Sequence, residues 1–202
     1  MKIAILVEGK TEKAFKLHLT VFLQGKLAGK MPRLDTFPYH GRIPKEGKLR
    51  RTVENLLRTG KPPADAVIAL TDVYTGSNDF QNAQDAKDKM RNWVGTNDHF
   101  YPHVAQYDFE AWLLPFWNEI QRIAGHNRNP PPGPPETVNH NHPPSYHIQE
   151  IFRIGTCRDG YVKPRDANRI LRGKNLAEAA RQCPELKAFL NTILQLSGGQ
   201  PL

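Results

Sequence analysis

The chain has 202 residues, of which 39% are hydrophobic and 24% are charged. This composition is typical of one compact domain of ordinary size and excludes a disordered chain. No run of about 18 apolar residues is present, which excludes a membrane-spanning helix, and the apolar N-terminal run is too short for a secretory signal. Two cysteines are too few for a disulfide framework or a zinc site, so we expect a cytoplasmic protein with reduced thiols.

The charge balance favours polyanionic partners. Lys and Arg number 28 against 20 Asp and Glu, which gives a formal net charge of +8 and a pI of about 9.6. Each phosphate that a protein neutralises releases a condensed counterion, so a basic surface suits nucleic acid or nucleotides. The alternative is a solvated basic surface that only aids solubility.

Short apolar segments alternate with segments of helical periodicity over the first part of the chain. Buried strands are predicted at residues 3–7, 34–39, 66–70 and 101–106. Helices are predicted from a cap at Thr11 to a stop at Gly25, and over residues 48–58, 79–94 and 109–123. Pro115 lies inside the last of these, so it is either an early-turn proline or the point where the helix restarts. This alternation predicts an α/β domain with a mainly parallel sheet.

Residues 127–144 hold seven of the 17 prolines, a composition that predicts an extended loop. The loop is either an ordered surface crossing or a flap over a site. Helices are predicted after it at residues 146–154 and 176–196, joined by a basic stretch over 158–174. The expected organisation is therefore an α/β core over 1–126, a proline-rich loop over 127–144, and a helical part over 145–202 that packs on the core within one structural domain.

Acidic residues follow three of the predicted strands. Glu8 comes after the first, Asp72 after the third, and Asp108 with Glu110 after the fourth. Because the carboxyl ends of parallel strands lie at one edge of a sheet, these side chains are expected to converge and to share Mg²⁺ or Mn²⁺. The alternative is that they only cap helices, a role that suits Asp108.

Several sequence blocks carry a resemblance to a known family. Glu8-Gly9-Lys10-Thr11-Glu12, directly after a hydrophobic strand, resembles the V-E-G-x-T-E opening of Toprim-like proteins. The whole chain resembles the DUF4276 family, a bacterial group with a Toprim-related fold. The matching blocks are residues 7–15, 71–76 and 107–114, the proline-rich segment, Tyr161 with Lys163, and the closing stretch over 175–190.

The resemblance implies a Toprim-like, Rossmann-like four-stranded sheet flanked by helices, with a helical C-terminal extension. It also implies nuclease activity and an ABC-type ATPase partner in a bacterial defence setting. By the family pattern Glu8 is the general acid-base or metal-binding glutamate, and Asp72 is the first aspartate of a D-x-D pair that holds Mg²⁺. Tyr74 stands where the second aspartate belongs, and Glu110 is the candidate for the missing ligand.

Phosphate contacts are predicted for a set of cations: Lys10, Lys163, Arg165, Arg169, Arg172 and Lys174. The alternative is that they form solvated faces. Gly9 and Glu12 belong to the same opening motif and are further site candidates. No G-x-x-x-x-G-K-[ST] sequence is present, so the chain is not expected to hydrolyse ATP by itself.

Three functional hypotheses follow. The first is a metal-dependent Toprim-like nuclease or phosphodiesterase. The second is a catalytically silent subunit that binds nucleic acid or nucleotide beside an ATPase. The third is an interaction module that docks through the apolar helix containing Trp112.

Overall fold

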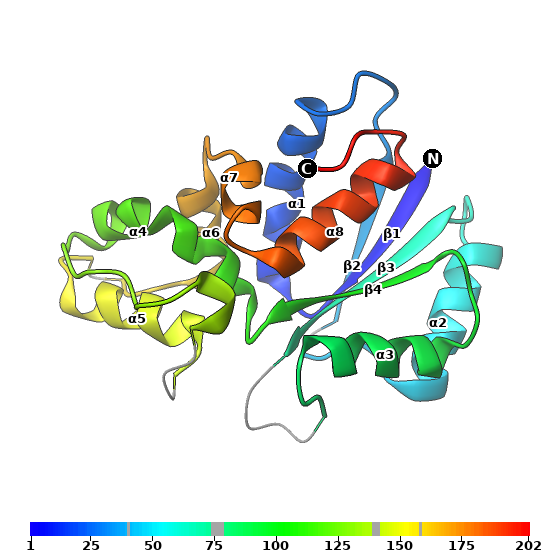
Figure 1. The fold of residues 1–202 in the computed structure, drawn as a ribbon, viewed down its shortest axis with the longest axis horizontal. Helices are drawn as coiled ribbons and strands as arrows, with labels where there is room; N and C mark the ends of the chain where they lie inside the picture. Colours follow the sequence, from blue (N-terminus) through cyan, green and yellow to red (C-terminus); the bar gives the residue numbers. More distant parts are fainter. Residues whose placement is uncertain (40, 74–78, 139–141, 158) are drawn as a thin grey trace.

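A computed structural model describes residues 1–39, 41–73, 79–138, 142–157 and 159–202. Four strands form one sheet in the order β2-β1-β3-β4, and every neighbouring pair is parallel (Figure 1). The strands are β1 (Lys2–Val7), β2 (Arg33–Pro38), β3 (Ala66–Val73) and β4 (Phe100–Gln106). The predicted parallel α/β fold is confirmed.

The two central strands are mainly apolar because helices cover both of their faces. Every residue of β1 and β3 is buried. Successive side chains of a strand point to opposite faces, so β1 divides its residues between two cores. Ile3 and Ile5 belong to one core, while Ala4 and Leu6 belong to the other.

The smaller core lies under α2 (Glu46–Arg58) and α3 (Ala83–Val94), on one side of the sheet (Figure 1). The helix predicted over 79–94 begins later because Asn82 caps it. The Asn82 side chain accepts a hydrogen bond of 2.9 Å from the backbone N–H of Asp85, which satisfies one of the free amides of the first turn.

The larger core lies on the opposite face and includes the C-terminal helices (Figure 1). Its elements are α1 (Lys10–Gln24), η1 (Phe109–Phe116), α4 (Trp117–Ala124), η2 (Pro135–Thr137), α5 (Pro144–Ile154), α6 (Lys163–Leu171), α7 (Leu176–Ala180) and α8 (Pro184–Leu196). Trp112 is only 1% exposed within this core. It therefore offers no docking face, and the third hypothesis is wrong in that form.

Several predicted helix boundaries are wrong for physical reasons. Gly9, not Thr11, occupies the N-cap of α1, and this residue makes no side-chain capping hydrogen bond. The segment over 109–123 is a 3₁₀ helix up to Phe116 and then restarts as α4, so here the predicted alternative of a restart at Pro115, which cannot donate a backbone hydrogen bond, is confirmed. The segment over 176–196 is likewise two helices, and Pro184 begins the second.

Helix α6 was missing from the prediction, because the basic stretch over 158–174 was interpreted only as a connection. Pro164 lies in the first turn of α6, where a proline costs no backbone hydrogen bond. This helix matters for function, since its N-terminus reaches the site described below.

Glu136 ties the described part of the proline-rich segment to the larger core. Its carboxylate accepts hydrogen bonds from Trp112 Nε1 at 3.0 Å and from the backbone amides of Glu185 and Leu186 at 2.9 and 3.2 Å. Those amides open α8, whose dipole favours a carboxylate there. These contacts favour the ordered loop over the flap for this part of the segment.

Within the described ranges, none of the helices has the length and apolar character needed to cross a membrane.

Candidate functional site

Five buried carboxylates gather at the carboxyl edge of the sheet. Glu8 directly follows β1, Asp72 lies near the end of β3, and Asp108 follows β4. Glu12 comes from the first turn of α1 and Glu110 from η1. All five are at most 8% exposed. We call these five residues the acidic cluster.

Glu8 and β3 are joined by direct contacts. The Thr71 hydroxyl donates a hydrogen bond to Glu8 Oε1, and the backbone N–H of Asp72 donates to the same oxygen at 3.3 Å. The parallel pairing of β1 with β3 brings these residues together although they are far apart in sequence. Glu8 is therefore held in place by a neighbouring strand, with its second carboxylate oxygen directed elsewhere.

The backbone at the end of β4 places Asp108. Tyr107 has a φ of 68°, a left-handed conformation that is uncommon for a non-glycine residue and that concentrates at functional sites. Asp108 Oδ2 then accepts a hydrogen bond of 3.1 Å from the backbone N–H of Ser145, in the first turn of α5. Although Asp108 occupies the N-cap of η1, its side chain makes no capping hydrogen bond there.

The other oxygen of Asp108 lacks a hydrogen bond. Oδ1 is buried and has no hydrogen-bond partner among the described residues, in a side chain that is 0% exposed. A buried carboxylate oxygen without a partner is costly. This oxygen is available to a bound cation.

Glu110 is held by the segment that leads into α6. Tyr161 donates its hydroxyl hydrogen to Glu110 Oε1 at 3.2 Å, and Lys163 Nζ lies 3.3 Å from both carboxylate oxygens. Lys163 is 42% exposed in its side chain, so it faces both the buried carboxylate and the solvent. The C-terminal part of the chain thus completes a site that the sheet begins.

Burial raises the pKa of every member of the acidic cluster. The pKa of Asp72 is raised well above its usual value by burial and then by the charges of Glu8, Glu12, Asp108 and Glu110, in that order. For Glu110, burial and the neighbouring Asp108 raise the pKa to about 7, although Lys163 opposes this. Burial alone would lower the pKa of Lys163, but Glu110 and Asp108 more than offset it and raise that pKa.

The opening motif also lies at the cluster. Lys10 is exposed and begins α1. At Gly9 a methyl group would stand 3.3 Å from Glu12 Oε2, closer than an ordinary contact. Because Gly9 has no side chain, the Glu12 carboxylate has space beside it.

Of the cations predicted from the C-terminal part, only Lys163 contacts the acidic cluster. Arg165 and Arg169 each lie 2.9 Å from the buried carboxylate of Asp166, and Lys174 lies 3.4 Å from Glu119. Arg172 is exposed just past the far end of α6. Tyr74, the remaining predicted site residue, lies outside the described residues.

Metal binding at this site requires some rearrangement or bridging water. The oxygen donors are of the hard type that Mg²⁺ and Mn²⁺ prefer, and Asp108 Oδ1 has an unused lone pair. However, no three Asp, Glu, His or Cys side chains in the described ranges surround one point closely enough to hold an ion together. Mg²⁺ usually keeps several waters and takes one or two carboxylates plus substrate phosphate, so the residues fit such an ion without forming a closed cage.

Three contributors to the site were not among the predicted site residues. Thr71 and Ser145 bind carboxylates through a hydroxyl and a backbone amide, contacts that depend on tertiary placement. Thr71 lies in the 71–76 block of the family resemblance, which does not say what its hydroxyl contacts, and Ser145 leaves no sequence signal. Tyr161 does leave one, since it belongs to the Tyr161-x-Lys163 block of the family resemblance.

Comparison with known proteins agrees with this geometry. Residues 7–194 match the sequence model of the family described as "Domain of unknown function (DUF4276)". The chain belongs to the DUF4276 family. No curated protein matches this DUF4276 chain. Its fold is similar to a solved structure of the C-terminal region of the Burkholderia pseudomallei OLD protein, with a TM-score of 0.55, 12% identity, and coverage of 96% of this chain and 98% of that one. At such low identity the likeness concerns the fold alone.

The raised pKa values predict that this DUF4276 protein loses stability as pH rises. A carboxyl whose folded pKa exceeds its unfolded value binds more protons when folded, so the free energy of unfolding falls between the two values. For Glu110 this interval runs from 4.5 to about 7, which corresponds to a loss on the order of 3 kcal/mol. Chemical denaturation of wild type and Glu110→Gln between about pH 5 and pH 8 measures it, and we expect a smaller loss in the variant.

Two comparisons isolate this effect. The pKa of His103 is lowered to about 3 by burial, so His103 removes stability as pH falls below its unfolded value of 6.5. That contribution is common to both proteins and cancels in the difference. The control is Glu178→Gln, a substitution at an exposed residue, which should leave the pH dependence of stability as in wild type. A pH dependence of Glu110→Gln identical to that of wild type would refute the assignment.

Proposed function

We propose that this protein is a metal-dependent, Toprim-like nuclease or phosphodiesterase that acts on nucleic acid. The observation that carries the proposal is the acidic cluster itself, in which five carboxylates are buried side by side and one buried oxygen of Asp108 has no hydrogen-bond partner among the described residues. Mutually repelling buried carboxylates destabilise a fold unless a cation or protons neutralise them. A divalent cation is the neutralising group that also serves phosphodiester hydrolysis.

The residues would divide the work as follows. Asp72, Asp108 and Glu110 would hold Mg²⁺ or Mn²⁺, which neutralises phosphate charge and lowers the pKa of a bound water. Glu8 would act as general acid-base or as a further ligand, since burial raises its pKa toward neutrality. Lys163 and Lys10 would contact the phosphates of the substrate as point charges. The net charge of +8 supports a polyanionic substrate.

Cleavage assays test the catalytic part of the proposal. With Mg²⁺ or Mn²⁺, wild type should cut at least one of supercoiled plasmid, linear duplex DNA or RNA. Glu8→Gln and Asp72→Asn should lower the rate about 100-fold or more, as expected for a lost general acid-base or metal ligand. Glu136→Gln is the matched control, because Glu136 is also a buried carboxylate but lies outside the acidic cluster. Cleavage that survives both cluster substitutions would end the catalytic assignment.

A second candidate is a catalytically silent subunit that binds nucleic acid or nucleotide. The observation in its favour is that no closed metal-ligand set exists among the described side chains. The family resemblance further suggests an ABC-type ATPase as the partner of either version, in a bacterial defence system.

Thermal unfolding with added Mn²⁺ separates metal binding from catalysis. Mn²⁺ near 100 times its dissociation constant should raise the melting temperature of wild type by about 5 °C or more. Asp72→Asn should respond far less, while Glu136→Gln should keep the shift even if its starting temperature is lower. A shift without cleavage would favour the silent subunit. Equal shifts in wild type and Asp72→Asn would place the metal elsewhere.

A further inference from the structure

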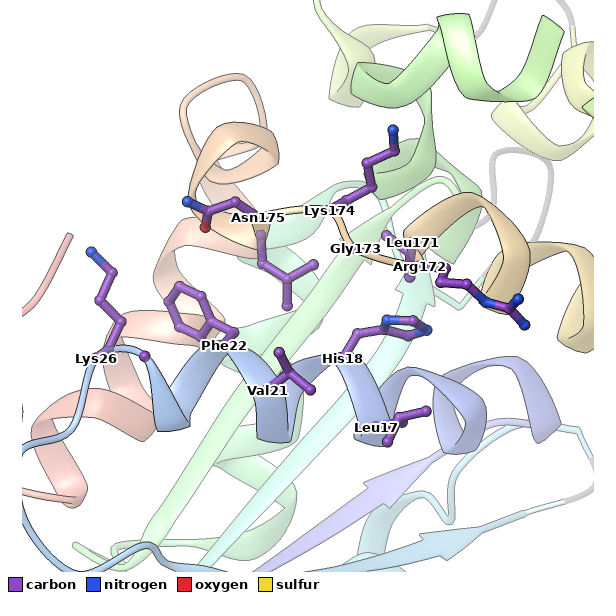
Figure 2. A pocket seen from close by; sticks show the side chains of 12 residues that line it. Leu17, His18, Val21, Phe22, Lys26, Leu171, Arg172, Gly173, Lys174 and Asn175 are labelled. Carbon is purple, nitrogen blue, oxygen red and sulfur yellow. The ribbon is translucent and has the colours of Figure 1, made fainter. Parts of the chain in front are cut away.

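A groove of about 570 Å³ runs along the outer face of α1, away from the acidic cluster. One wall is α1 itself, with Leu17, Val21 and Phe22, and the other is the segment between α6 and α7. Figure 2 shows these walls facing each other, with Val21 and Phe22 on the helix and Gly173 with Lys174 opposite. The groove begins about two turns, or ~10 Å, beyond the start of α1.

Two large apolar side chains in this groove are exposed. Leu17 is 61% exposed and Val21 is 59% exposed. They are four residues apart and so lie next to each other on one helix face. Together they form a small apolar surface on α1 that a partner can cover.

Three cations also belong to the lining. Lys26, Arg172 and Lys174 line the groove, and no acidic residue is among its described lining residues. Arg172 also borders a second hollow of about 170 Å³, which it shares with Arg122, Arg169 and Glu119. An occupant must therefore present apolar groups to the α1 wall and negative charge to the cations at the rim of the groove.

We propose that this groove docks an amphipathic helix of a partner protein whose apolar face is flanked by acidic side chains. The α1 wall of the groove presents apolar residues, which suits the spaced apolar anchors of a helix lying in a groove. The rim cations Lys26 and Arg172 complement acidic flanks, and such pairing steers association and sets orientation, whereas Lys174 is already paired with Glu119.

Other occupants fit less well. A small ligand is normally enclosed by its pocket, whereas Leu17 and Val21 project largely into solvent. A second copy would bring a basic rim against a chain that carries a net charge of +8. Single-stranded nucleic acid binds exposed aromatic rings, but Phe22, the one Phe, Tyr or Trp among the described lining residues, is 7% exposed.

The proposal stands apart from the proposed nuclease function, because no member of the acidic cluster lines the groove. Loss of docking and loss of metal-dependent cleavage can therefore be told apart with variants of different residues.

A designed peptide tests the docking. The probe is a fluorescein-labelled helical peptide of about 18 residues, or ~27 Å as a helix, with a leucine stripe flanked by glutamates. Fluorescence anisotropy should show binding to wild type that weakens at least about tenfold in Val21→Asp and in Arg172→Glu, and Leu17→Asp should repeat the first effect. Ile154→Asp, an exposed apolar residue on α5, and Arg58→Glu, an exposed cation at the end of α2, are the matched controls.

Several results would overturn the proposal. These are no binding by wild type, equal binding of a scrambled peptide of the same composition, or binding unchanged in folded Val21→Asp and Leu17→Asp. Duplex DNA that competes with the peptide and loses affinity in the same apolar variants would assign the groove to nucleic acid instead. Melting temperatures of all variants establish that each is folded.

Discussion

Electrostatic repulsion among buried carboxylates is the constraint on which the site depends. Parallel strands direct Glu8, Asp72 and Asp108 to one edge of the sheet, where water that would screen their charges is largely excluded. Hydrogen-bond donors at this edge of the sheet offset part of the repulsion. Backbone amides of Asp72 and Ser145 and the cation of Lys163 each reach one carboxylate. These donors offset only part of the repulsion, since the pKa of every cluster member is still raised by burial.

The C-terminal helices are therefore part of the site as well as of the core. The start of α5 places an amide on Asp108, and the start of α6 places Lys163 on Glu110. Both contacts come from segments that follow the proline-rich loop, and Glu136 of that loop anchors α8 to the same core. An α/β sheet alone would present the carboxylates without these partners. The larger core contains residues of both the sheet and the C-terminal helices. It therefore holds the two halves of the site in fixed positions relative to each other.

The sequence predicted the sheet and the gathering of carboxylates because both follow from local rules. Apolar runs mark buried strands, and the ends of parallel strands share an edge. The boundary at Pro184 and the whole of α6 were not predicted, and Pro115 left two alternatives open, because a proline in a first turn and one inside a helix give the same sequence signal. The partners Thr71 and Ser145 could not be predicted, since hydroxyl and amide donors are supplied by tertiary packing. Charge density alone also could not show that Arg165 and Arg169 pair with the internal Asp166.

The central claim is that the acidic cluster holds a divalent cation, and the most direct measurement is anomalous diffraction from a crystal soaked in Mn²⁺ near neutral pH. The account predicts a peak at the carboxyl edge of the sheet, within about 2.1–2.5 Å of an oxygen of Asp72 and of Asp108 or Glu110. Water would complete the coordination. An edge without such a peak, in a crystal where these carboxylates are ordered and free of lattice contacts, would contradict it.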